Sequence, residues 1–147
     1  MKKQYKDKAV KILEEYGSRE KKRNTPERRI ILKTAYSTDE CFSLQWLEEK
    51  LKKDNYTVSK ATLYNAMEKF MLLKLFVELS LGDNRLTYSH TIGAENRVTL
   101  KCTEPKCNSV TNHEMPELDD LRKLVEKRYG FTTRSHSFVM HGTCKKH

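Results

Sequence analysis

Residues 57–75, with the sequence TVSKATLYNAMEKFMLLKL, carry the clearest helix signal in the first half of the chain. Ser59 is a favourable N-cap for this helix. The apolar positions that recur at helical spacing are Leu63, Ala66, Met67 and Phe70. The opposite face carries Lys60, Thr62, Tyr64, Asn65 and Lys69, with Glu68 as its only acid. The pattern predicts a helix that buries one face and presents donors and an aromatic ring on the other.

The elements on either side of this helix predict a winged helix-turn-helix. Three shorter helices precede it, over residues 5–16 (ended by Gly17), from Pro26 after a Thr25 cap, and from Ser43. Two strand-like runs follow it, residues 75–80 and 85–89, joined by a Gly82-containing turn. In such a fold the helix after Ser59 lies in the DNA major groove, and Arg85 on the hairpin reaches a phosphate. The alternative is a helical bundle with an incidental hairpin.

The second half of the chain predicts a small α/β unit. Residues 97–101 and 109–113 are short strand candidates, residues 116–129 form a helix stopped by Gly130, and residues 131–142 alternate as a strand. The expected buried stripe of the helix is Leu118, Leu121, Val125 and Tyr129. The fold class is therefore α+β, with a winged-helix domain over 1–89, a hinge over 90–96, and an α/β dimerisation and metal-binding domain over 97–147.

Charge is concentrated at one end of the chain. The protein has 147 residues and a formal net charge of +9, and residues 1–35 hold 12 Lys and Arg against 5 Asp and Glu. A basic arm of this kind indicates a polyanionic partner, of which nucleic acid is the usual one and an anionic membrane another. A merely solvated basic segment is the third interpretation.

Neither a secretory signal nor a run of about 20 apolar residues is visible, so we expect a cytoplasmic protein with reduced thiols. Its cysteines then favour metal binding or core packing over disulfides. Cys102 and Cys107 flank a tight turn, and Cys144 and His147 form a Cys-x-x-His pair at the end. Together they make a Cys3His set, which is a common composition of structural zinc sites. The alternative is three inert thiols.

Catalytic patterns are missing from the sequence. A zinc deaminase places His-x-Glu before its cysteine pair, whereas His113 and Glu114 are adjacent and follow Cys107. Neither a Ser/His/Asp set nor a glycine-rich phosphate loop appears. We therefore expect no enzyme and no small-molecule substrate.

Several motifs together resemble the ferric uptake regulator (Fur) family of metal-responsive transcriptional regulators. These are, in family order, NTPERRIIL, TVSKATLYNAMEKF, LGDNRLTYS, ELDDLRKLVEKRYGF, SHSFVMHG and the closing Cys-x-x-His. The resemblance implies a homodimer that represses transcription from an AT-rich inverted repeat, as in iron homeostasis. It also implies that Tyr64 contacts bases, that Ser59, Lys60, Thr62 and Asn65 lie beside it, and that Arg28 binds phosphate.

The chain departs from the family at several ligand positions. Asn65 stands where the family usually has Arg, Cys102 and Cys107 are separated by four residues instead of two, and His147 replaces a cysteine. The positions that match or lie beside the family's sensory ligands are Cys41, His90, His113, Asp119 and His136. The resemblance implies a regulatory iron or zinc ion there that closes the two domains. Because several usual ligands are missing, the alternatives are a protein closed without metal and one that responds to haem or to an oxidant at Cys41. The rival hypothesis is a zinc-stabilised interaction module whose basic arm binds RNA or a protein.

Overall fold

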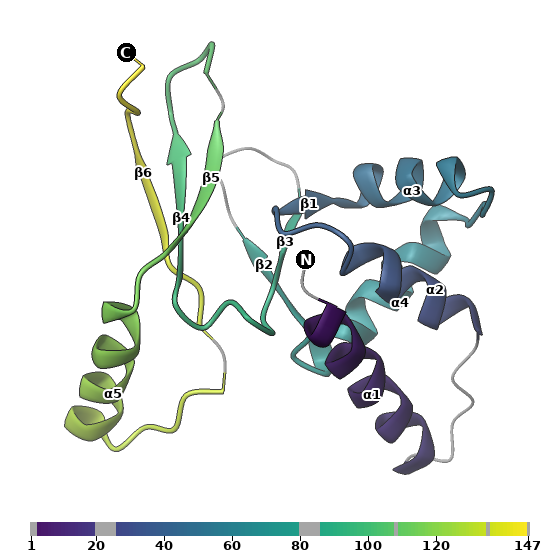
Figure 1. Cartoon of the computed structure of the whole chain (residues 1–147), viewed down its shortest axis with the longest axis horizontal. Coiled ribbons are helices and arrows are strands. Elements are labelled where there is room, and N and C mark those ends of the chain that lie inside the picture. Colours follow the sequence, from purple (N-terminus) through teal and green to yellow (C-terminus); the bar gives the residue numbers. More distant parts are fainter. Residues whose placement is uncertain (1–2, 20–25, 80–85, 108, 135, 147) are drawn as a thin grey trace.

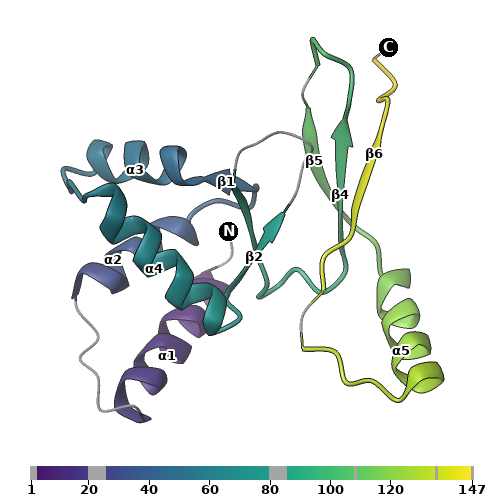
Figure 2. The same ribbon diagram turned by 180° about the vertical axis from the view of Figure 1, so that it is seen from behind.

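The computed structural model describes residues 3–19, 26–79, 86–107, 109–134 and 136–146. Its elements are α1 (Lys3–Arg19), α2 (Pro26–Ala35), β1 (Phe42–Ser43), α3 (Leu44–Lys53), α4 (Lys60–Leu72), β2 (Phe76–Leu79), β3 (Thr87–His90), β4 (Arg97–Cys102), β5 (Val110–Glu114), α5 (Glu117–Tyr129) and β6 (Val139–Gly142). The predicted α+β class is confirmed. Figures 1 and 2 show α1–α4 with β1–β3 beside a second part made of β4–β6 and α5. Within the described ranges, no helix has the length and apolar composition needed to cross a bilayer.

The four N-terminal helices enclose one apolar core. All four predicted core positions of α4 are buried, and Ser59 caps the helix by accepting a hydrogen bond from the Thr62 backbone N–H at 3.1 Å. The core residues that the other helices supply are Ala9, Leu13, Ile31, Leu32, Ala35, Leu47 and Leu51. The prediction that Gly17 ends α1 is wrong, because Gly17 is buried inside the helix, which runs on to Arg19. Tertiary packing here outweighs the low helix propensity of glycine.

A small antiparallel sheet, called sheet A below, closes the N-terminal part. Its strand order is β1-β3-β2, with Phe42 opposite Tyr88 and Phe76 opposite His90. The β2–β3 pair is the predicted hairpin, although its turn residues 80–85, Arg85 among them, lie outside the described residues. Strand β1 was not predicted, because two residues are too few to show a period of two.

The second sheet, called sheet B below, has the order β5-β4-β6. Strands β4 and β5 are antiparallel, with Thr99 opposite Asn112, and β6 runs parallel to β4. The strand predicted over 131–142 is too long, because among its described residues only Val139–Gly142 forms a strand, paired with β4. Gly130 ends α5 in the left-handed conformation, as the sequence predicts.

The predicted buried stripe of α5 is wrong within a single chain. Leu118 is buried, but Leu121, Val125 and Tyr129 are 43%, 38% and 70% exposed. Figure 1 shows why, since α5 lies beyond one end of sheet B and no other helix covers it. The helix is amphipathic as predicted, but in the described residues its apolar face is left largely exposed.

Candidate functional site

The exposed face of α4 is the first candidate site. Ser59 and Lys60 are exposed at its start, followed by Tyr64, whose side chain is 46% exposed, and by exposed Asn65. Thr62 is partly buried, and its hydroxyl lies 2.8 Å from the Ser59 hydroxyl. Because Ser59 and Thr62 hold each other within the helix cap, Lys60, Tyr64 and Asn65 are the side chains left to reach a ligand.

Of the two arginines expected to bind phosphate, Arg28 and Arg85, the structure describes only Arg28. Arg28 lies in the first turn of α2 and is partly buried. Its neighbour Arg29 forms an ion pair with Glu14 of α1 at 2.7 Å and so joins the two helices. Arg85 lies outside the described residues.

Three cysteines form the second candidate site. The Sγ atoms of Cys102, Cys107 and Cys144 all lie within 4.8 Å of one another, and those of Cys107 and Cys144 are 3.6 Å apart. Cys102 is buried at the end of β4, Cys107 closes the following turn, and Cys144 comes just after β6. His147 lies outside the described residues.

The chemistry of this cluster suits a thiophilic metal ion. The backbone hydrogen bond from Ser109 lowers the pKa of Cys107 to about 7, so its thiolate, the form that binds metal, is readily available. Two backbone bonds fix the turn, from Cys102 N to Ser109 O at 2.9 Å and from Cys107 N to Glu104 O at 3.0 Å. In the parts of the chain that the structure describes, this is the only such group of three or more Cys, His, Asp or Glu side chains.

The five candidate sensory residues do not form one group. His90 is 1% exposed inside the N-terminal core, where its Nε2 lies 2.7 Å from the carbonyl oxygen of Ala35. Cys41 precedes β1, and its Sγ lies 3.9 Å from Oδ1 of Asn112. His113 is exposed on β5, with its Nε2 3.0 Å from the Thr111 hydroxyl.

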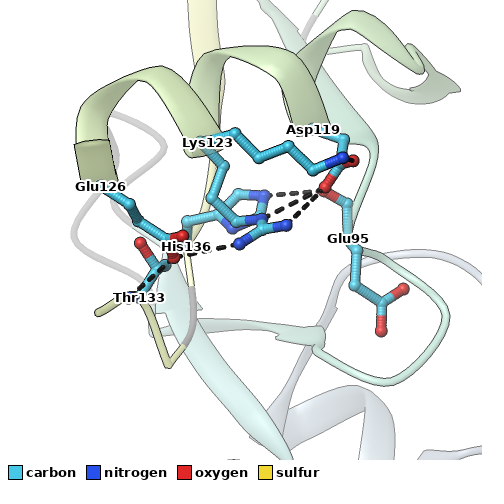
Figure 3. A network of polar contacts seen from close by, with 7 residues as sticks. Glu95, Asp119, Lys123, Glu126, Thr133 and His136 are labelled. Carbon is cyan, nitrogen blue, oxygen red and sulfur yellow. Dashed lines mark hydrogen bonds and ion pairs between the residues drawn. The ribbon is translucent and has the colours of Figure 1, made fainter. Parts of the chain in front are cut away.

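Asp119 and His136 do line one pocket, but positive side chains fill its surroundings. Arg122 and Lys123 form ion pairs with Asp119 at 2.8 and 3.0 Å, and hydrogen bonding to Arg122 lowers the pKa of the Asp119 carboxyl. The Nε2 of His136 lies 2.7 Å from the backbone oxygen of Glu95. Figure 3 shows this network, in which Glu126 also accepts a hydrogen bond from the Thr133 backbone N–H. Cationic partners already satisfy the carboxylate that a divalent ion would need.

The two metal sites that the family implies therefore differ in how well their side chains are arranged to bind a metal ion. The cysteine cluster fits a structural metal ion, since three thiol ligands already converge. The sensory set does not fit one, because each of its five residues has a protein partner and the described positions leave them dispersed.

Sequence reasoning missed Asn112 and Arg97, which contact the N-terminal part from sheet B. Asn112 Nδ2 donates to the Asp39 carbonyl oxygen at 3.4 Å, and Arg97 Nη1 donates to the Ser89 hydroxyl at 3.4 Å. A polar residue in an alternating strand gives no warning of such a role. Only the strand register, which places Thr99 opposite Asn112, shows that the two side chains can hydrogen-bond, and the sequence alone does not give that register.

Comparison with known proteins agrees with this architecture. The peroxide-responsive repressor PerR of Staphylococcus aureus (strain USA300) is 24% identical over 124 residues, which make up 84% of this chain and 81% of the relative. The ferric uptake regulator Fur of Helicobacter pylori superposes with a TM-score of 0.74 at 16% identity, covering 96% of this chain and 92% of that one. A zinc uptake regulator in complex with zinc and DNA gives 0.53 at 19% identity, covering 96% and 93%.

The solved structures establish the fold, and a family model establishes the relationship. The model of the ferric uptake regulator family matches residues 19–141, from the end of α1 into β6. That range takes in the helix α4 and two of the three clustered cysteines. This chain is therefore a member of the ferric uptake regulator family of transcriptional regulators.

Proposed function

We propose that this protein is a sequence-specific repressor that binds an AT-rich inverted repeat as a homodimer. The observation that supports this most directly is the outer face of α4. A helix capped by Ser59 presents Lys60, Tyr64 and Asn65 to solvent, with only Glu68 as an acid on that face. A basic, donor-rich helix face beside a strand hairpin is suited to entering the major groove.

The proposed contacts are of two kinds, those to phosphates that position the protein and those to bases that recognise the DNA sequence. Lys60 and Arg28 neutralise phosphates, joined by Arg85 on the hairpin, and these contacts fix the register of the protein on the duplex. Tyr64 and Asn65 read bases, since a tyrosine ring packs against a thymine methyl group and an asparagine amide pairs with adenine. In this scheme Ser59 and Thr62 shape the start of the helix instead of reading bases, because they hydrogen-bond to each other.

We further propose a structural zinc ion bound by Cys102, Cys107, Cys144 and His147. The convergence of three Sγ atoms supports the site, and a terminal imidazole is a normal fourth ligand. The ion would hold the end of β4, the next turn and the end of β6 together. Regulation by an effector belongs to the proposal, but we assign no sensory metal to the five dispersed residues.

The proposed division of labour follows the two parts of the molecule. Residues 1–89 bind DNA, residues 90–96 connect, and residues 97–147 dimerise and hold zinc. The exposed apolar face of α5 supports the dimer, because a second copy would bury Leu121, Val125 and Tyr129. A repressor of chromosomal operators acts in the cytoplasm, and we place the protein there.

The test is in vitro selection of DNA sites from a random duplex library by the zinc-loaded protein, followed by titration of the selected site. We expect an AT-rich inverted repeat. Tyr64→Ala should weaken binding to the selected duplex roughly tenfold or more, since base contacts are worth about 1–3 kcal/mol each. Binding to a scrambled duplex, which depends on phosphates, should change little.

Leu72→Ala is the matched control, because Leu72 lies on the same helix and its side chain is 65% exposed. It should bind like the wild type. Recovery of no consensus sequence, together with equal affinity for RNA of the same length, would favour an interaction module over a repressor. Equal affinity of Tyr64→Ala and Leu72→Ala for the selected duplex would show that Tyr64 does not contact bases.

A further inference from the structure

The Asn112 side chain uses both ends of its amide at the junction between the two parts. Its Nδ2 donates to the backbone oxygen of Asp39 at 3.4 Å and lies 4.0 Å from Sγ of Cys41. Its Oδ1 accepts a hydrogen bond from the Thr99 hydroxyl at 2.8 Å. Thr99 lies directly opposite on β4, so it fixes the orientation in which the amide reaches the loop between α2 and β1.

Arg97 makes the second contact, two residues before Thr99 on the same strand. Its guanidinium donates to the hydroxyl of Ser89, which is 5% exposed on β3. Strands β1 and β3 are neighbours, and Phe42 pairs with Tyr88. Cys41 and Ser89 each adjoin one member of that pair, so Asn112 and Arg97 hold the same end of sheet A.

The chemistry of this junction differs from that of a transition-metal site. Iron and zinc bind thiolates, imidazoles and carboxylates, whereas the groups that hydrogen-bond across the junction are a neutral amide, two hydroxyls and a guanidinium. Asp39, Glu95, His113 and Glu114 line the adjoining pocket, but in the described residues their ligand atoms do not converge in a group of three. The guanidinium keeps its positive charge at every physiological pH and repels a divalent cation. Cys41 is the only thiol in the set, and its Sγ lies next to the amide.

We propose that Asn112 and Arg97 are positioning residues that latch the two parts of the protein together without a metal ion. Asn112 secures the α2–β1 loop, and Arg97 secures β3. The consequence for DNA binding rests on the proposed function. The latch itself concerns only how the two parts are held together, which can be measured without DNA. A protein latched in this way needs no second metal, beyond the proposed structural zinc, to keep its DNA-binding part in place.

The latch is tested by small-angle X-ray scattering of the full-length zinc-loaded protein. Chelator is kept at a level at which elemental analysis still finds one zinc per chain, and Mn²⁺ or Zn²⁺ is then added. We expect the radius of gyration of the wild type to stay unchanged by added metal. The double variant Arg97→Ala/Asn112→Ala should expand, and its affinity for the selected duplex should fall about thirtyfold, which corresponds to the loss of two ordinary hydrogen bonds.

Thr111→Ala is the matched control, because Thr111 adjoins Asn112 on β5 and its side chain is exposed. Asn112→Asp provides a second variant of the same size, whose carboxylate cannot donate to Asp39 but can bind metal beside Cys41. It should expand in chelator and contract with Zn²⁺. Compaction of the wild type by metal would overturn the latch, as would variants that scatter like Thr111→Ala. Scattering decides this even if the wild type binds no DNA, so the two proposals fail separately.

Discussion

His90 shows how its surroundings convert a candidate metal ligand into a core residue. Its ring contacts those of Tyr36, Phe42 and Phe76, with centroids 4.7, 5.6 and 5.4 Å away. Burial lowers the pKa of His90 to about 4, so the ring is neutral at pH 7. A neutral imidazole donates from Nε2 to the Ala35 carbonyl oxygen, which ties β3 to the end of α2.

This burial predicts a loss of stability in mild acid. The pKa of His90 is lower in the folded protein than in the unfolded chain, where it is about 6.5, so the unfolded chain binds the proton first. Stability should therefore fall as the pH drops below about 6.5 and level off near pH 4. Between pH 7.5 and pH 5 the contribution of His90 amounts to roughly 2 kcal/mol.

Urea unfolding of His90→Gln at several pH values checks this contribution. The variant is expected to be less stable than the wild type at pH 7.5, but the difference should shrink toward pH 5. Exposed His141 on β6 supplies the control, and His141→Gln should keep the wild-type pH dependence. Parallel pH curves for wild type and His90→Gln would contradict the assignment.

At the same scale, the sequence predicts local chemistry well and burial poorly. The Ser59 cap depends on residues within one turn and is confirmed at 3.1 Å. Whether His90 faces solvent or a core depends on Tyr36 and Phe42, which lie about 50 residues earlier and meet it only in the folded sheet. The roles of Arg97 and Asn112 were missed for the same reason.

At the scale of elements, helices were predicted more accurately than strands. The stripe of α4 is set by residues three and four apart, whereas β6 exists only where it meets β4. Parallel pairing of these strands brings Cys144 back to Cys102 and Cys107, and it could not be derived from the spacing of the cysteines. Backbone contacts such as Thr103 N to Gly142 O at 2.8 Å reinforce the return.

The proposed zinc ion should therefore stabilise β6 more than it stabilises α4. Cys107→Ser should lower the zinc content from one ion per chain toward zero, because it removes a ligand from a closed site. Amides of β6 should then exchange with deuterium faster, and those of α4 should be little affected. Elemental analysis and hydrogen exchange measure the two effects.

Cys41→Ser is the control for this experiment, since Cys41 lies outside the cluster. It should retain one zinc per chain and the exchange pattern of the wild type in β6. Full zinc occupancy in Cys107→Ser would show that the metal, if bound, does not depend on this cluster.

At the scale of the whole molecule, one surface remains incomplete in the single chain. Besides the face of α5, the paired residues Leu100 and Met140 of sheet B are 39% and 55% exposed. Leu124 on α5 and Phe131 just after it are also 47% and 62% exposed. A helix that leaves its apolar face uncovered in this way is typical of an interaction surface. The sequence predicted the amphipathic helix and an apolar face suited to dimerisation, but periodicity alone shows only that a face is suited to burial and not what buries it.

The proposed homodimer predicts that a charge on this face separates the protomers. Leu124→Glu should give a monomer by light scattering after size-exclusion chromatography, because the carboxylate would be buried without a partner. Leu72→Glu makes the same change at a side chain that is 65% exposed on α4 and should remain dimeric. If Leu124→Glu stays dimeric, α5 is not the interface. If it is monomeric, it should bind a single half-site as the wild-type protomer does but lose the added affinity of the inverted repeat, since that gain comes from joining two DNA-binding parts.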